Sequence, residues 1–241
     1  GTKEEIQIPG QYEVPADETM VLTTRLPDDY DENTIALRSS LQDVMFYIDG
    51  ELRGSYDTRS TRPFGKNSAS RYVFCDTSDA DAGKELRIEL TTHTDNYSGV
   101  VNAVCYGDRG DIWLLIFHEH GMETIMGFFV LFAGVITIIF SAALGVVYKT
   151  KFDMEYLGWC MLMGAIWMLG ESKLRQLWIP NASILAMMCF VVILLGPIPF
   201  LIYMDSVQKG RYTRIYQFME AVVLLNFFVS TILEMTGKID Y

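Results

Sequence analysis

One short run of residues combines types that could bind a metal ion: His118, Glu119 and His120, with Glu123 close behind. On a strand, alternate side chains point the same way, so His118 and His120 would share a face. Two histidines do not complete a site, because zinc in proteins takes three or four protein ligands. The run also joins an acidic first half of the chain to an apolar segment. We therefore interpret it as an interfacial linker and predict no metal there.

The sequence contains no other short motif of known chemistry. It has no phosphate-binding P-loop, no GxSxG nucleophile elbow, no HExxH and no CxxC. We therefore predict neither a catalytic residue nor a cofactor in this stretch.

Basic residues gather in one part of the acidic half, where they could bind an anionic ligand. They are Arg59, Arg62, Lys66 and Arg71. With nearby aromatic residues they give a set of candidate ligand-binding residues: Arg59, Arg62, Arg71, Tyr56 and Tyr97. The alternative is a solvated loop whose charges are balanced locally by acidic neighbours.

Ionisable residues inside apolar segments are a second kind of candidate, because charge at membrane depth is costly and usually faces a bundle interior. Glu171 and Arg175 lie four residues apart, would share a helix face and could pair. Glu220 precedes an apolar run, with Asn226 further along. These four residues are candidates for a polar contact that couples helices during signalling. The alternative is that Glu171 and Glu220 lie near the interface and reach water.

The four cysteines divide between the two halves of the chain. Cys75 and Cys105 lie in the predicted external domain, where a disulfide could persist outside the cytoplasm, and two isolated buried thiols are the alternative. Cys160 and Cys189 lie in apolar segments and are most simply packing residues.

The net negative charge of the chain lies entirely in its first half. The 241 residues carry a net charge of −11 and a mean hydropathy of +0.20. Residues 1–120 hold 22 acidic and 11 basic residues, whereas residues 121–241 hold 8 of each. An acidic surface repels phosphate backbones, so we exclude a nucleic-acid partner.

Residues 1–118 are predicted to form an all-β domain, a jelly-roll-like sandwich of two sheets. The predicted strands are 19–26, 34–40, 44–48, 51–56, 85–91, 99–106 and 111–117. The Asp49-Gly50 pair between two of them indicates a tight hairpin, because both turn positions need positive φ. We predict no helix before residue 120.

Residues 119–241 are predicted to form an α-helical transmembrane bundle in a lipid bilayer. Residues 124–148 contain no Asp, Glu, Lys or Arg. A helix of that length rises about 37 Å, enough to cross a hydrocarbon core of about 30 Å. Four spans are expected, at about 124–148, 156–178, 182–204 and 215–235. Pro197 and Pro199 should kink the third near one end.

Basic residues in the loops predict the orientation of these spans. The loops after the first and third spans carry five: Lys149, Lys151, Lys209, Arg211 and Arg214. The opposite side carries three: Lys173, Arg175 and Lys238. This bias places the first domain outside the cytoplasm.

Several stretches resemble a bacterial receptor family. They are NTIALRSS at 33–40, QDV at 42–44, YIDG at 47–50, AGKELRI at 82–88 and WMLGESKLRQ at 167–176. The first four are similar to the external jelly-roll domain of membrane-bound diguanylate cyclases, and the last resembles a membrane segment of the same proteins. These cyclases belong with the seven-transmembrane receptors that carry diverse intracellular signalling modules.

The resemblance implies a multi-pass protein of the bacterial cell membrane, with an external sensor domain. Such proteins continue into a cytoplasmic GGDEF domain, which makes cyclic di-GMP from GTP, and the resemblance implies a homodimer formed through that domain. The chain departs from the family pattern, since it has four predicted spans and no GGDEF motif. It begins at Gly1 and ends soon after an apolar run, so we expect it to be a piece of a longer protein.

A carbohydrate is the first candidate ligand, because the expected jelly roll also resembles sugar-binding domains of glycosidases. The tyrosines available as platforms are Tyr12, Tyr30, Tyr56 and Tyr97. A signalling ligand must bind two arrangements of the bundle with different affinity. Two alternatives remain: a membrane-anchored binding module, and part of a transporter with polar groups gathered at broken helices.

Overall fold

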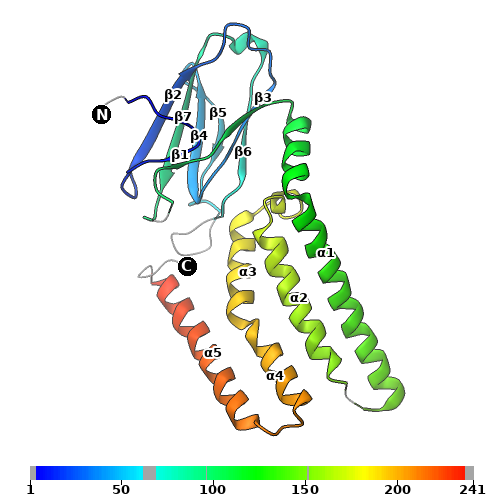
Figure 1. The fold of residues 1–241 in the computed structure, drawn as a ribbon. Helices are drawn as coiled ribbons and strands as arrows, with labels where there is room; N and C mark the ends of the chain where they lie inside the picture. The colour runs from blue at the N-terminus through cyan, green and yellow to red at the C-terminus, as the bar shows by residue number, and fades with distance from the viewer. Residues whose placement is uncertain (1–3, 62–68, 96, 151, 237–241) are drawn as a thin grey trace. The chain divides into compact units, whose positions relative to one another are not determined.

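The computed structural model describes residues 4–61, 69–95, 97–150 and 152–236, and strands in its first part are followed by helices (Figure 1). The chain divides into two compact units, one of residues up to 118 together with 180–184, the other of residues 119–179 and those from 185 on. The first boundary falls inside a helix, between His118 and Glu119. We call them the β-unit and the helical unit and describe each by itself.

The described part of the β-unit contains nine strands. They are β1 (Gly10–Gln11), β2 (Thr19–Arg25), β3 (Thr34–Arg38), β4 (Gln42–Ile48), β5 (Glu51–Tyr56), β6 (Tyr72–Asp76), β7 (Glu85–Thr92), β8 (Val100–Val101) and β9 (Val104–Gly107), with a short 3₁₀ turn, η1 (Asp79–Asp81).

These strands form antiparallel sheets between which the chain passes back and forth. One sheet has the order β2-β7-β4-β5, a second has the order β6-β3-β9, and β1 pairs with β8. Successive strands change sheet at almost every step; the exception is the β4–β5 hairpin. Its turn residues Asp49 and Gly50 have φ of 50° and 81°, the left-handed conformation that the pair predicted.

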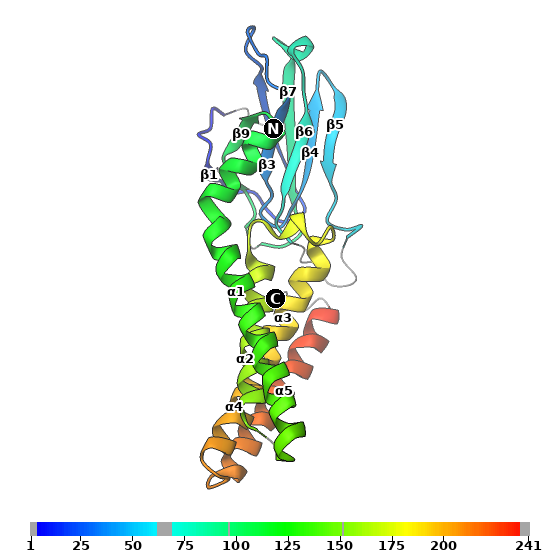
Figure 2. The ribbon, with the colours of Figure 1, turned by 90° about the vertical axis from the view of Figure 1, so that its right-hand side faces the viewer.

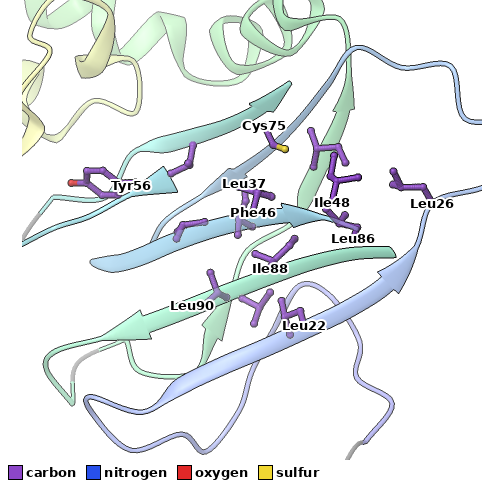
Figure 3. Close-up of a cluster of buried hydrophobic side chains, with 14 of the residues drawn as sticks. Leu22, Leu26, Leu37, Phe46, Ile48, Tyr56, Cys75, Leu86, Ile88 and Leu90 are labelled. Atoms are coloured by element: carbon purple, nitrogen blue, oxygen red, sulfur yellow. The ribbon is translucent and has the colours of Figure 1, made fainter. Parts of the chain in front are cut away.

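One apolar core lies between the two larger sheets. In β4, Val44, Phe46 and Ile48 are buried and the residues between them are half-buried, so the strand turns one face inward. The same alternation runs through β7. Figure 3 labels core side chains from both sheets: Leu22, Leu26, Leu37, Phe46, Ile48, Tyr56, Cys75, Leu86, Ile88 and Leu90.

Helix α1 (Arg109–Tyr148) corrects the sequence prediction at its start. We expected a strand over 111–117 and no helix before residue 120, and both expectations are wrong. Ile112 and Ile116 are buried whereas Leu114 is 66 % exposed, which is the spacing of a helix face and not of a strand. Trp113 fixes this start, because its ring lies 5.3 Å from that of Phe74 on β6.

The other helices follow the predicted apolar segments with changed boundaries. They are α2 (Met154–Glu171), the 3₁₀ turn η2 (Arg175–Leu177), α3 (Ala182–Leu195), α4 (Pro197–Val207) and α5 (Thr213–Met235). The break between α3 and α4 falls at Gly196, beside Pro197 and Pro199, whose missing N–H groups predicted a kink there.

Three stretches of helix in the described part of the chain are long and apolar enough to cross a membrane: Arg109–Tyr148, Ala182–Val207 and Thr213–Met235. The predicted second span is not among them. Helix α2 stops at Glu171, seven residues before its expected end at Trp178, because Ser172 takes an extended conformation with ψ of 136°.

Helices α1 and α2 lie side by side and antiparallel (Figure 1). A Cβ placed on Gly127 would lie 2.8 Å from Cδ2 of Leu169, and one on Gly134 would lie 3.1 Å from the carbonyl oxygen of Gly158. Gly127, Gly134 and Ser141 are buried at intervals of seven residues. Small residues at this spacing let two helix backbones approach closely, as membrane helices often do.

This contact predicts that Gly134→Val destabilises the helical unit by about 1–3 kcal/mol, because the new methyl groups have no room between the backbones. Gly164→Val is the matched control, since a Cβ on Gly164 meets no atom within 4 Å. The measurement is the fraction of the detergent-purified full chain that stays monodisperse after heating. Equal melting of the two variants would contradict the close approach.

Candidate functional site

Polar side chains meet at one end of the β-unit because the antiparallel register brings several strand ends together. Thr91 of β7 pairs with Thr19 of β2 and with Asp43 of β4, and Val44 pairs with Tyr56 of β5. Residues just beyond these positions therefore meet. We call the group the end cluster: Asp17, Asp43, Thr58, Arg59 and His93.

His93 is the centre of the end cluster, and its side chain is 6 % exposed. Its Nδ1 lies 2.7 Å from Oδ1 of Asp17, and its Nε2 lies 2.9 Å from Oδ2 of Asp43. The ring therefore lies between two carboxylates, with one nitrogen facing each of them. The histidine then joins two segments that are 26 residues apart in the sequence.

Asp43 and Arg59 make the remaining polar contacts of the end cluster. Oδ1 of Asp43 accepts the backbone N–H of Thr58 at 2.7 Å and also its hydroxyl, and Thr58 is 1 % exposed. Nη2 of Arg59 lies 3.8 Å from Oδ1 of Asp17 and 3.3 Å from Nδ1 of His93. The shorter contact of Asp17 with Nδ1 indicates that this nitrogen donates to Asp17. The cluster therefore pairs two carboxylates with a guanidinium and an imidazole.

Two other predicted ligand-binding residues of the β-unit, Arg71 and Tyr56, contact each other. The guanidinium of Arg71 lies 5.2 Å from the ring centre of Tyr56, whose hydroxyl donates to the carbonyl oxygen of Ala69 at 2.9 Å. Tyr97 is 57 % exposed with φ of 63°, and its carbonyl accepts a hydrogen bond from Gln42. Arg62 and Lys66 lie outside the described residues.

Two of the four tyrosines expected to serve as sugar platforms are buried. Tyr56 is 5 % exposed and Tyr30 is 8 % exposed. The Tyr30 hydroxyl lies 2.8 Å from that of Thr77, and burial raises the pKa of Tyr30 above its usual range. Tyr12 is half-buried and its hydroxyl donates to the carbonyl oxygen of Gln7. Tyr97 is therefore the member of this set with an accessible ring.

Three members of the end cluster could not be identified from the sequence. Asp17, Asp43 and His93 carry no motif, and their partners lie 50 and 76 residues apart in the chain. A usable signal was their position, because each lies at or just beyond the end of a predicted strand.

In the helical unit, Glu171 and Arg175 do not share a helix face as predicted. Helix α2 ends at Glu171, and Arg175 follows in η2. Glu171 is exposed, whereas Arg175 is 7 % exposed and its Nη1 donates to the carbonyl oxygen of Gly170 at 2.7 Å. The guanidinium thus bonds to a carbonyl group at the end of α2.

The candidates on α5 lie in different surroundings. Glu220 is half-buried and Asn226 is exposed. Glu234, near the end of α5, is 5 % exposed and was not singled out from the sequence. It is therefore Glu234, and not the predicted pair, that has the buried acidic side chain on this helix.

The His118–His120 run lies in α1, so its two histidines do not point the same way as on a strand. His118 is exposed, and Nε2 of His120 lies 2.9 Å from Nζ of Lys173. One turn further along, the hydroxyls of Thr124 and Ser172 lie 2.6 Å apart. The run therefore contributes to a polar contact between α1 and the end of α2.

No disulfide joins Cys75 and Cys105, so that prediction is wrong. Cys75 on β6 pairs with Ile35, and Cys105 on β9 pairs with Ala36, so β3 lies between the two cysteines. Neighbouring residues of β3 point to opposite faces, and so do their partners. Two strand spacings separate the Cα atoms by about 9.6 Å, beyond the reach of a disulfide.

The sequence matches no protein-family model and none of the curated proteins. The function is therefore argued from the site and from the architecture.

The end cluster predicts that Asp43→Asn destabilises the strands it joins by about 1–3 kcal/mol, because an amide cannot accept from Thr58 and His93 together. Hydrogen exchange of the full chain in nanodiscs should show faster exchange in β4 and β5. Glu18→Gln is the control, since Glu18 is exposed and lies beside Asp17. Unchanged exchange in Asp43→Asn would show that the cluster does not hold these strands together.

Cys75 is predicted to resist alkylation in the folded chain. Burial raises the pKa of its thiol to about 11, so at pH 8 about one thiol in a thousand is ionised. Iodoacetamide should leave Cys75 unmodified until urea is added, and both Cys75 and Cys105 should then react without a reducing agent. Peptide mass spectrometry measures this, and a linked Cys75–Cys105 peptide would contradict the structure.

Proposed function

We propose that this chain is the sensory and transmembrane portion of a bacterial signalling receptor that regulates a cytoplasmic diguanylate cyclase. The observation that carries the proposal is the continuity of α1 (Figure 2). Its residues 109–118 belong to the β-unit and the remainder to the helical unit, with no break in the helix. A structural change in the β-unit can therefore be transmitted along one hydrogen-bonded helix.

Contacts at the start of α1 join it to the three-stranded sheet. Nη2 of Arg109 lies 3.2 Å from Oδ1 of Asp76, and its guanidinium lies 5.0 Å from the ring centre of Phe74. Nδ2 of Asn33 donates to Oδ1 of Asp108 at 2.7 Å. Together with Trp113, these contacts connect the ends of β6 and β9 to the first turn of α1.

The strand order supports a jelly roll for the proposed sensor. A jelly roll has eight strands in two sheets, built from two Greek keys. Here the chain alternates between the sheets β2-β7-β4-β5 and β6-β3-β9, with one hairpin at β4–β5. Counting β8 and β9 as one interrupted strand gives eight, with β1 as the fourth member of the second sheet.

We also propose that α2 is a fourth membrane-embedded helix. Polar contacts occur near both ends of its pairing with α1: Thr124 with Ser172, and the Ser141 hydroxyl with the carbonyl oxygen of Phe152. Ser141 follows Thr124 by 17 positions along α1, a rise of about 26 Å, which is close to the thickness of a hydrocarbon core. The excess of basic residues after the first and third spans supports an external β-unit.

The proposed ligand is a carbohydrate or another small molecule that binds the β-unit, and Tyr97 is its accessible aromatic contact. Arg59 and Asp17 are the exposed members of the end cluster, with side chains 64 % and 63 % exposed. The cyclase output and the homodimer formed through it come from the family resemblance.

The two alternatives fit these observations less well. A transporter would gather polar groups at its broken helix, but the break at Gly196 is flanked by Leu195 and Pro197. An anchored binding module needs no continuous helix between its two parts and no polar contacts among its spans.

A substitution in α1 of the intact protein tests whether this helix couples the β-unit to the proposed cyclase. Met122 is 73 % exposed and lies in α1 before the apolar run, so Met122→Pro breaks the helix there at a cost of about 3 kcal/mol without filling a packed site. Met122→Ala is the control. In membranes supplied with GTP, we expect Met122→Pro to change the rate of cyclic di-GMP synthesis several-fold and Met122→Ala to leave it unchanged. Equal rates would favour a tether, and no synthesis by the unsubstituted protein would exclude the cyclase.

A further inference from the structure

The turn between α1 and α2 forms an open cavity of about 290 Å³. Its lining comes from the last two turns of α1, the connecting segment and the first turn of α2. The residues are Ser141, Ala142, Gly145, Val146, Lys149, Thr150, Phe152 and Glu155. The volume lies at the lower edge of pockets that hold small ligands, about 300–1,000 Å³.

Small residues of α1 line part of the cavity, and a hydrogen bond holds the connecting segment against them. The buried Ser141 donates its hydroxyl to the carbonyl oxygen of Phe152 at 3.2 Å, which ties the connecting segment to α1. Gly145 lets the connecting segment approach α1 closely, since a Cβ there would lie only 3.3 Å from the carbonyl oxygen of Thr150. Small residues of α1, Ser141, Ala142 and Gly145, therefore line one part of the cavity.

Two opposite charges line this cavity without an ion-pair partner among the described residues. They are Lys149 and Glu155, both exposed. The Thr150 hydroxyl, which donates to the carbonyl oxygen of Tyr148 at 3.4 Å, lines the cavity as well. The lining thus offers an ammonium group, a hydroxyl and a carboxylate.

The turn follows the whole apolar run of α1, so in a membrane it lies at the surface opposite the one where α1 enters. Tyr148 is 65 % exposed beside the cavity, and its ring lies 6.2 Å from that of Phe152. Tyrosines are typical of the level of the lipid head groups. Val146 and Val147 are 80 % and 70 % exposed on the apolar side of the turn.

We propose that this cavity binds the head group of phosphatidylethanolamine. The phosphate would be bound by Lys149 and the Thr150 hydroxyl, and the primary ammonium would donate to Glu155. The acyl chains would run along Val146 into the bilayer. The charge pattern selects this lipid, because it carries one anionic and one hydrogen-bonding cationic group. This proposal needs only that the α1–α2 hairpin enters a membrane, and does not rest on the receptor role.

Native mass spectrometry of the detergent-purified full chain tests the assignment. The probes are phosphatidylethanolamine, phosphatidylcholine and phosphatidylglycerol with identical acyl chains. Phosphatidylcholine has the same phosphate, but its quaternary ammonium has no N–H to donate to Glu155. We expect one retained phosphatidylethanolamine, favoured about fivefold over phosphatidylcholine, which corresponds to about 1 kcal/mol.

Four variants test the proposed contacts with the lipid one at a time. Glu155→Gln should remove the preference over phosphatidylcholine, and Asp153→Asn, at an exposed neighbour outside the cavity, should keep it. Lys149→Gln should weaken retention of both lipids, because both carry the phosphate. Ala142→Phe should fill the cavity and abolish retention.

Ala143→Phe is the control for added bulk, because Ala143 is exposed and does not line the cavity. Monodisperse elution of every variant excludes misfolding as the cause. Stronger retention of phosphatidylglycerol, unchanged in Glu155→Gln, would overturn the proposal. So would equal retention of all three lipids, or displacement of the lipid by an equal concentration of free phosphoethanolamine.

Discussion

The packing of Trp113 on Phe74 determines where the strand part of the chain becomes helical. A tryptophan ring buries a large apolar area, and here it does so against β6, the edge strand beside β3 in the three-stranded sheet. Once Trp113 faces the sheet, Ile112 and Ile116 fall on the covered side only if the backbone is helical. The first turns of the membrane helix therefore depend on a side-chain contact within the β-unit.

The helical unit depends on a different constraint, the absence of water to satisfy polar groups. Its polar contacts lie near both ends of the α1–α2 pair, whereas Gly134 and Gly158 meet between them. Close backbone approach replaces the hydrophobic driving force that lipid cannot supply. The charged residues follow the same division, since Lys149 and Glu155 lie at one turn and Lys173 and Arg175 at the other.

Much of the fold could be predicted where one face of an element is buried. Strands β2, β4, β5 and β7 were found from alternation and the Asp49-Gly50 turn, because burial on one side imposes a period of two. The run 111–117 was misread as a strand because every residue after Asp111 is apolar, and a short apolar run does not distinguish the period of a strand from that of a helix. The end of α2 was misplaced because apolar residues continue past Glu171, where Ser172 turns the backbone away.

The candidate site was less predictable, because it depends on which strand ends meet. Arg59 was found as a charge, but its partners Asp17 and His93 lie 42 and 34 residues away. Their meeting places a guanidinium beside the carboxylate of Asp17 within an acidic domain. A ligand at this end would compete for the two exposed members, Asp17 and Arg59, and leave the buried contacts of His93 with Asp43 intact. Binding there would act on the segment before β2, which a backbone hydrogen bond from Asp17 to the carbonyl oxygen of Thr92 also holds to β7.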